Sequence, residues 1–314
     1  MNLLISSATM GLIFVPLALG LFVSYRVYQT LDLTTDGSFG VGVAVVAALL
    51  VRGVSPVTAT LLGAMAGVLA GAITGIVHTQ FRVGALLAGV LTTTALYSVD
   101  LFVMGGGNLP LANTESLVKL AERIGQQRFG IPETLTILGT SVSGGSLATL
   151  AMMGVLACGL ALALTLFLGT DLGLAMRAAG NNPRMAKAVS IDVDRMVIVG
   201  LGLANGFIAL SGALLAQHEG FANIQMGFGA VVTAVATLMV GEALFGKRPL
   251  GRWIAGVVAG SVVFRLLLAL AIRAGLHPNA LKLVTTVFVL TVLVIPELTR
   301  AARRRAMGSG AQHA

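Results

Sequence analysis

The chain has 314 residues, of which 56% are hydrophobic and only 10% are charged. A soluble domain carries about 25% charged residues, so this composition excludes a water-soluble globular protein and indicates an integral membrane protein. The net charge of +8 at pH 7 is then a signal of membrane orientation rather than of nucleic-acid binding. One cysteine and four scattered histidines exclude an internal disulfide framework and form no metalloprotease or metal-site pattern.

Nine apolar runs in the chain are candidates for membrane-spanning helices, each of which needs about 20 mostly apolar residues. We therefore predict an all-α, polytopic transmembrane bundle of about nine spans, within a range of eight to ten, in a single domain over residues 1–314. The second run is short for a span. The nine runs are Met10–Val27, Phe39–Val51, Val57–Val77, Val83–Val103, Leu147–Leu168, Met196–Leu215, Phe228–Phe245, Ile254–Ile272 and Leu281–Ile295.

Basic residues gather in the polar stretch 169–195 and in the tail 298–314. Cytoplasmic loops carry an excess of Lys and Arg, so we predict that both regions are cytoplasmic and that the N-terminus lies outside. The segment 105–146 is then mainly extracytoplasmic. It contains Lys119, Glu122, Arg123 and Arg128 on a predicted amphipathic helix. These basic residues, and Arg273, fit the charge rule less well because they fall outside.

A polar run, Asp32-Leu-Thr-Thr-Asp36, stands between the first two apolar runs. A charge at membrane depth is expensive and usually functional, whereas a charge at a boundary is a solvated helix cap. Location alone leaves both interpretations open, and Asp36 is the candidate cap for a helix beginning near Gly37. Asn205 lies inside a later span, where a hydrogen bond between helices is favoured over a place on a solute path. The candidate pathway residues are Asp32, Thr34, Thr35, Asp36 and Asn205.

The third apolar run carries glycines at a spacing of four, which places them on one face of a helix. In membranes such stripes allow close helix approach. Ordinary packing inside the bundle is favoured over a subunit seam. The helix-packing residues are Gly63, Gly67, Gly71 and Gly75.

The polar stretch 169–195 separates two apolar runs and contains Asn182-Pro183. The residue before proline is disfavoured in a helix, so we predict two short helices, Leu172–Ala179 and Arg184–Val189, joined by this break. Such a pair, with basic and apolar residues exposed together, can dock into a groove on a soluble partner. A cytoplasmic loop with the usual basic bias is the alternative.

This stretch resembles the coupling-loop motif of ABC importer permeases of the branched-chain amino acid and ribose permease family, roughly G-x3-R-A-x-G-x-N-x3-A-x3-G-I. It departs from the motif at Ser190, where the family usually has glycine. The run from Leu31 to Phe39 resembles a subgroup paired with amino-acid binding proteins, including aromatic ones. The residues that the resemblance assigns to ATPase coupling, with Arg184 beside them, are Gly173, Arg177, Ala178, Gly180, Asn182, Arg184, Ala186 and Ile191.

The resemblance implies a permease subunit of a bacterial ABC importer, multi-pass in the inner membrane, that forms the path for a small polar solute such as an amino acid. It implies a second permease subunit in a homodimer, ABC ATPase subunits that bind ATP and Mg, an extracytoplasmic substrate-binding protein and surrounding lipid. We expect no catalytic residue, metal or cofactor in this chain. The run Gly241–Arg248 nearly matches a P-loop, but Arg248 replaces the Ser or Thr that holds magnesium.

Two other functional classes are weighed against this interpretation. An ion-gradient-driven secondary transporter usually shows internal repeats with related polar sites near the membrane midplane, and the Asp32–Asp36 run has no second copy. An intramembrane enzyme would need a catalytic pair inside the spans, and no convincing pair is found. Copurification with an ATPase separates these classes.

Overall fold

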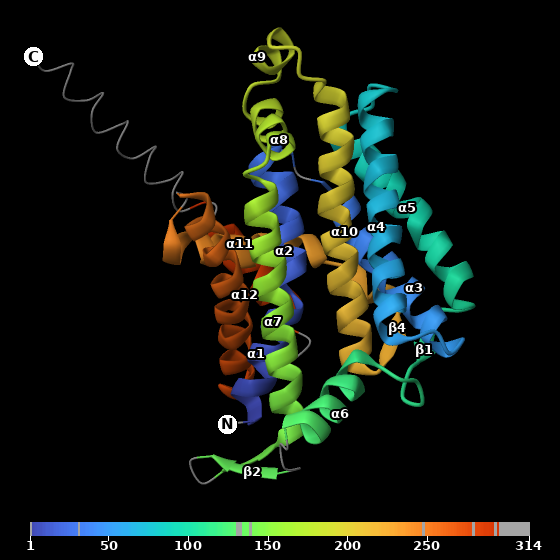
Figure 1. Ribbon diagram of the computed structural model, residues 1–314, viewed down its shortest axis with the longest axis vertical. Helices are drawn as coiled ribbons and strands as arrows, with labels where there is room; N and C mark the ends of the chain where they lie inside the picture. Colours follow the sequence, from blue (N-terminus) through green and yellow to red (C-terminus); the bar gives the residue numbers. More distant parts are fainter. Residues whose placement is uncertain are drawn as a thin grey trace, which may run out of the picture.

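The computed structural model describes residues 2–30, 32–129, 134–137, 140–246, 249–277, 280–291 and 294. These residues form a bundle of long helices (Figure 1) with eight segments long and apolar enough to cross a membrane. The predicted all-α polytopic bundle is confirmed, and its span count falls within the predicted range. The eight segments are Leu3–Val27, Thr34–Val51, Pro56–Thr79, Ala85–Met104, Gly144–Phe167, Val193–Glu219, Ile224–Phe245 and Leu250–Arg273.

The ninth predicted span begins where a shorter apolar helix, Leu281–Thr291, is found. Residues 292, 293 and 295 of the predicted run lie outside the described residues, as do the basic tail and Lys247 and Arg248. The orientation of the bundle across the membrane therefore stays a prediction.

The first span is divided into α1 (Asn2–Ile13), α2 (Val15–Leu21) and a π-helical turn, η1 (Phe22–Val27). Pro16 stands in the first turn of α2, where its missing N–H leaves no helical hydrogen bond unmade. Residues 28–30, 32 and 33 lie between η1 and α3 (Thr34–Val51) and belong to neither helix. Two long helices follow, α4 (Pro56–Thr79) and α5 (Ala85–Met104).

The second half of the chain contains α7 (Gly144–Phe167), α10 (Val193–Glu219), α11 (Ala230–Phe245) and α12 (Leu250–Arg273). The 3-10 turn η2 (Ile224–Gly227) leads into α11. The expected amphipathic helix is present as α6 (Leu117–Phe129), and the two short helices of the polar stretch are α8 (Asp171–Asn181) and α9 (Pro183–Ala188).

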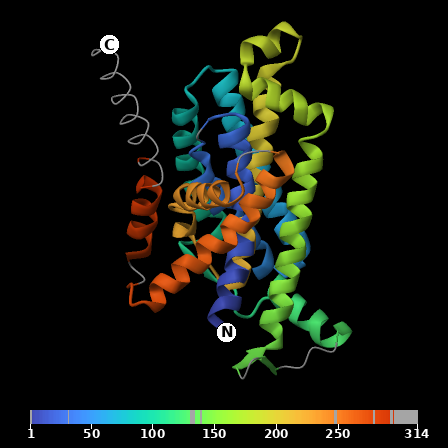
Figure 2. The same cartoon turned by 90° about the vertical axis from the view of Figure 1, so that its left-hand side faces the viewer.

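Two short antiparallel strand pairs, which the sequence analysis did not predict, complete the fold. Strand β1 (Asn108–Pro110) pairs with β4 (Phe221–Asn223), with Leu109 opposite Ala222. Strand β2 (Thr134–Ile137) pairs with β3 (Thr140–Ser143). Figures 1 and 2 show α8 and α9 at one end of the bundle, here called the loop end, and the N-terminus, α6 and the β2–β3 hairpin at the other, here called the hairpin end.

Helix α10 lies at the centre of the bundle and packs against α2, α3 and α4. The glycine stripe of α4 faces it. A Cβ atom at Gly67 or Gly71 would overlap the backbone of α10 near Asn205 or Leu201. Gly75 approaches Ile198 of the same helix, whereas Gly63 lies beside the Gly42 carbonyl of α3. The stripe therefore lets two helices pack backbone to backbone within one subunit.

We expect Gly71→Leu to prevent folding, because a leucine side chain has no room between α4 and α10. Overpacking a tight interior costs about 1–3 kcal/mol or more, and here the obstacle is backbone rather than a flexible side chain. The measurement is the yield of monodisperse protein by size-exclusion chromatography in detergent. Gly159→Leu on α7 is the matched control, since a Cβ at Gly159 meets no atom within 4 Å. Equal yields from both variants would contradict the packing argument.

Candidate functional site

The segment 28–33 carries Asp32 into the interior of the bundle, where its side chain is only 3% exposed. One carboxylate oxygen, Oδ1, accepts a hydrogen bond from the Thr34 backbone N–H at 2.8 Å. The other, Oδ2, accepts one from the Asn205 side-chain amide at 2.7 Å. Asp32 therefore provides a hydrogen-bond acceptor for the first turn of α3 and links this helix to α10.

The depth of Asp32, which the sequence left open, follows from its bond to Asn205. At a rise of about 1.5 Å per residue, Asn205 lies about 18 Å from the start of α10 and about 21 Å from its end. This places Asp32 near the middle of the bundle rather than at a boundary. A carboxylate at such a depth is tolerated only with several hydrogen bonds, and the N-terminus of α3 adds favourable positive potential.

Threonines complete the network around Asp32. The hydroxyls of Thr34 and Thr74 lie 2.9 Å apart, and the Thr35 hydroxyl donates to the Asp32 carbonyl at 2.9 Å. Thr93 of α5 donates to the Leu33 carbonyl at 2.8 Å. The structure thus brings Asp32, Thr34, Thr35 and Asn205 together in a closed network. The adjoining cavity has a volume of only about 10 Å³, which is too small for a solute.

Asp36 does not cap the helix near Gly37, so this interpretation was wrong. Helix α3 already begins at Thr34, which puts Asp36 in its first turn with the side chain pointing elsewhere. Its oxygens accept hydrogen bonds from the backbone N–H groups of Gly229 at 3.1 Å and Val231 at 2.9 Å. Asp36 therefore caps α11, a helix almost 200 residues later in the chain, which sequence spacing does not reveal.

Asp100 of α5 is a buried acid that the sequence analysis did not select. It is 3% exposed, and its Oδ1 atom has no hydrogen-bond partner among the described residues. Together with Asp36 and Tyr97 it lines a cavity of about 30 Å³ between α3, α5 and η2. The available signal was an aspartate inside an apolar run, which is rare in spans unless it has a role. No group of three or more His, Cys, Asp or Glu residues that could hold a metal occurs in the described part of the chain.

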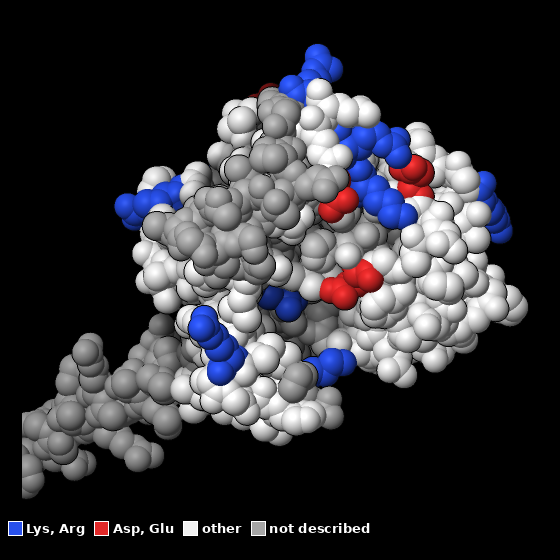
Figure 3. Space-filling model, turned by 90° about the horizontal axis from the view of Figure 1, so that it is seen from below, with Lys and Arg blue, Asp and Glu red and all other residues white. Residues whose placement is uncertain are grey.

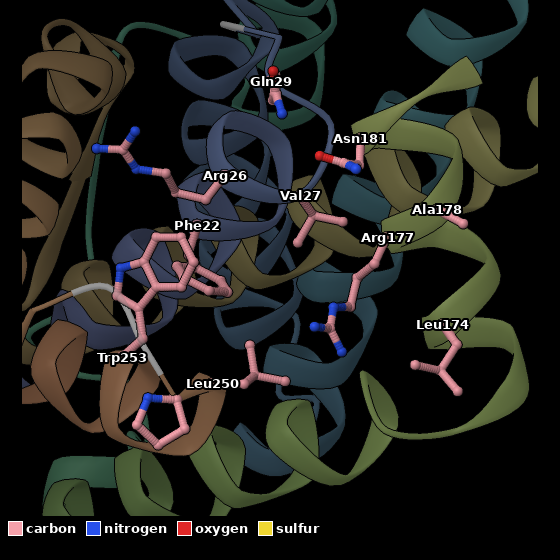
Figure 4. A pocket seen from close by; sticks show the side chains of 11 residues that line it. Phe22, Arg26, Val27, Gln29, Leu174, Arg177, Ala178, Asn181, Leu250 and Trp253 are labelled. Atoms are coloured by element: carbon pink, nitrogen blue, oxygen red, sulfur yellow. The ribbon is translucent and has the colours of Figure 1, made fainter. Parts of the chain in front are cut away.

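A larger cavity, of about 810 Å³, opens at the loop end between η1, α8 and the start of α12. Figure 4 shows Arg177 of α8 directed into this space, towards Leu250. On the far wall, Arg26 forms an ion pair with Glu242, and the Trp253 indole N–H donates to the same carboxylate at 3.2 Å. This ion pair was also missed in the sequence. Its signal was one charge of each sign inside two distant apolar runs.

The residues assigned to ATPase coupling divide into two groups. Most of them build the loop itself. Gly180 packs against the Val27 carbonyl and Gly173 against Leu168, and the Asn182 side chain accepts a hydrogen bond from the Met185 N–H at 3.1 Å. Ala186 is fully buried in a small cluster with other apolar residues of the loop, so it cannot contact a partner directly.

The second group faces outwards at the tip of the loop, and it consists of Arg184 together with three neighbouring residues that the resemblance did not assign. Met185 is 58% exposed and Val189 is 59% exposed, and Arg184 and Lys187 are exposed beside them. The result is an apolar surface with basic neighbours at the far end of the bundle, here called the α9 tip and consisting of Arg184, Met185, Lys187 and Val189.

The backbone at Ser190 adopts a conformation that suits the glycine usually found at this position of the family motif. Its backbone has φ +64°, in the left-handed region that glycine adopts readily and other residues adopt at a cost of roughly 1–2 kcal/mol. We therefore expect Ser190→Gly to stabilise the α9 turn by about 1 kcal/mol. Slower amide hydrogen exchange over residues 183–195, with unchanged exchange in α7, is the measurement. Faster exchange in the loop would contradict the strain argument.

Comparison with known proteins identifies the family to which this chain belongs. The family model described as "Branched-chain amino acid transport system / permease component" matches residues 3–295. The chain belongs to this permease family. It is a multi-pass protein of the inner membrane and the permease subunit of an ABC importer.

Individual relatives agree with this membership. The permease is 33% identical to a tyrosine transport system permease protein of Clostridioides difficile, over 97% of this chain and 95% of that protein. It is 27% identical to an autoinducer 2 import system permease protein of Yersinia pseudotuberculosis, over 68% of this chain and 54% of that protein. No solved structure matches the permease significantly.

Proposed function

We propose that the permease pairs with a second permease subunit to form the path for an amino acid or a closely related solute. An extracytoplasmic binding protein delivers the solute, and separate ATPase subunits, which bind ATP and Mg, drive the transport. The amino-acid assignment is supported by the relative named for tyrosine transport, which covers nearly the whole chain. The permease itself performs no covalent chemistry in this proposal.

The observation that carries the coupling role is the construction of α8 and α9. The helix pair α8 and α9 has its own buried cluster of Ala179, Ala186 and Val193. The pair therefore keeps its shape while it projects from the loop end (Figure 1). The exposed Met185 and Val189 side chains provide an apolar surface for a groove, and Arg184 supplies a planar group for carboxylates on the rim of that groove. A loop that only obeyed a charge bias would need no such core.

We assign the pathway role to the region where α3 and α11 begin. Both helices start inside the bundle, and many transporters place solute sites at such discontinuous helices near the membrane midplane. Asp32, Thr34, Thr35 and Asn205 hold the first of these helix starts, and Asp36 holds the second. In this proposal they keep the two helix starts in register beside the path while the path opens alternately to each side.

Reconstitution tests the proposed function directly. The permease, the ATPase encoded with it and the binding protein are placed in liposomes, and uptake of labelled amino acids and sugars is measured with ATP inside. We expect uptake that needs all three components and ATP, and that is unaffected by collapsing ion gradients with ionophores. Uptake that persists without the ATPase and stops with ionophores would instead identify a secondary transporter.

A further inference from the structure

A cavity of about 410 Å³ lies beside the start of α11. Its walls come from the junction of α1 and α2, from η2, α3, α11 and α12, and from the helix at 281–291. Three aromatic rings, Phe14, Phe39 and Phe228, line it, and two basic residues, Arg265 and Lys282, face it. Its volume lies within the range of about 300–1,000 Å³ typical of small-molecule sites.

Arg265 is the unusual member of this cavity, because it stands inside a membrane-spanning helix. Its guanidinium carbon lies 3.6 Å from the centroid of the Phe14 ring. Among the described residues it has no hydrogen bond and no ion pair, and its Nε atom is buried without a partner. The Glu219 carboxylate at the end of α10 acts on it through space but is not within ion-pair distance.

The contact with Phe14 provides no hydrogen-bond acceptors for the N–H groups of the guanidinium. A ring stabilises the cation through one face, whereas the five N–H donors lie in the plane of the group and point away from that ring. Buried charges in membrane proteins are almost always paired. A forked donor group that has no partner among the described residues and borders a cavity is therefore suited to bind an acceptor from outside the chain.

We propose that this cavity binds the carboxylate of the solute, with Arg265 as the residue that holds it. A carboxylate matches the planar fork of arginine in a two-bond arrangement. Lys282 is exposed at the rim and attracts the anion towards the cavity. The Phe39 and Phe228 rings offer an apolar wall for the remainder of the solute. Figure 3 shows the hairpin end, where separate basic side chains and a few acidic ones lie on a mostly uncharged surface.

This inference rests on the proposed import function and adds the group of the solute that is recognised. It also accounts for an arginine that makes no hydrogen bond or ion pair within the described part of the chain. A residue retained only for packing would be better served by an apolar side chain of similar size, because replacing buried charges by apolar groups is often neutral or stabilising.

Chemical footprinting on the wild-type assembly tests the proposal without relying on a variant that fails to fold. The reconstituted importer is treated with phenylglyoxal, and modification of each arginine is quantified by peptide mass spectrometry. The probes are the amino acid that the importer transports and its decarboxylated amine. We expect the amino acid, and not the amine, to slow modification of Arg265 at least fivefold, while the exposed Arg273 on the same helix reacts at an unchanged rate.

Binding measurements on variants provide the second arm. Arg265→Gln should raise the Kd of the transported amino acid at least tenfold, as expected for loss of a charge-assisted bond pair, and Arg273→Gln should leave it unchanged. ATPase copurification should stay normal in both variants.

Two results would overturn the proposal and leave the import function intact. One is equal modification of Arg265 with and without the transported amino acid. The other is ATP-driven import of a solute that lacks a carboxylate while amino acids are not carried. By contrast, failure of the proposed function would appear as the absence of ATP-dependent uptake altogether.

Discussion

Replacing Met185 and Val189 together with glutamate is expected to abolish copurification of the ATPase while the permease remains folded. Both side chains are more than half exposed at the α9 tip, so the change removes no internal packing. If each is buried on docking, its loss removes about 1.5–3 kcal/mol, which together corresponds to roughly 10²- to 10⁴-fold weaker binding. Two acids placed in the same groove would add repulsion from carboxylates on its rim.

The matched control is Met185→Leu with Val189→Ile, which keeps the apolar surface and should keep the ATPase bound. Both variants are compared with wild type by affinity purification in detergent and by substrate-stimulated ATP hydrolysis in liposomes. Ala186→Glu is not suitable for this experiment. Ala186 is fully buried, so a glutamate in its place would disrupt the packing of α8 against α9. Wild-type recovery of the ATPase with the double glutamate variant would exclude the α9 tip from the interface.

Asp32→Ala is expected to destabilise the permease by about 2–4 kcal/mol, because it leaves the buried Thr34 N–H without its acceptor and leaves the Asn205 amide with only the Leu201 carbonyl. The first turn of α3 therefore loses the hydrogen bond that its first backbone N–H makes to the Asp32 carboxylate. The measurement is the fraction of folded permease after heating in detergent. Uptake should fall in parallel, since α3 and α10 no longer share this link.

A double-mutant cycle with Asn205→Ala shows whether the two residues act as a unit. Asn205 donates to Asp32 at 2.7 Å, so the double variant should be less destabilised than the sum of the single variants by at least about 1 kcal/mol. Additive effects would mean that the bond contributes nothing measurable, and that Asp32 acts only as the cap of α3.

The membrane bundle itself could be predicted from composition and run length. Long apolar runs leave the backbone no alternative to helices in a lipid environment. The eight observed spans overlap the first eight predicted runs, and their ends agree within five residues except that the first span begins seven residues earlier. The break at Asn182-Pro183 and the two short helices around it were likewise local properties, set by the backbone restriction before proline.

The polar sites could be located in the sequence but not connected. Asp32 and Asp36 stood out because acids are rare in apolar stretches. Only the fold decided that Asp32 meets Asn205 and that Asp36 meets the start of α11, since these partners are more than 170 residues away in the chain. The same holds for Arg265, because only the packed helices show that it has no hydrogen-bond or ion-pair partner among the described residues.

The sequence by itself therefore determined the type and the approximate number of the spans, the glycine face of α4 and the helix pair α8 and α9, because each depends on residues close together in the chain. The tertiary structure decided which of these residues are buried supports and which are free surfaces. Ala186 and Met185 are neighbours in the chain, yet one is fully buried and the other is 58% exposed. That difference arises from packing against Val193 and Ala179, and packing between separate segments is not encoded in local spacing.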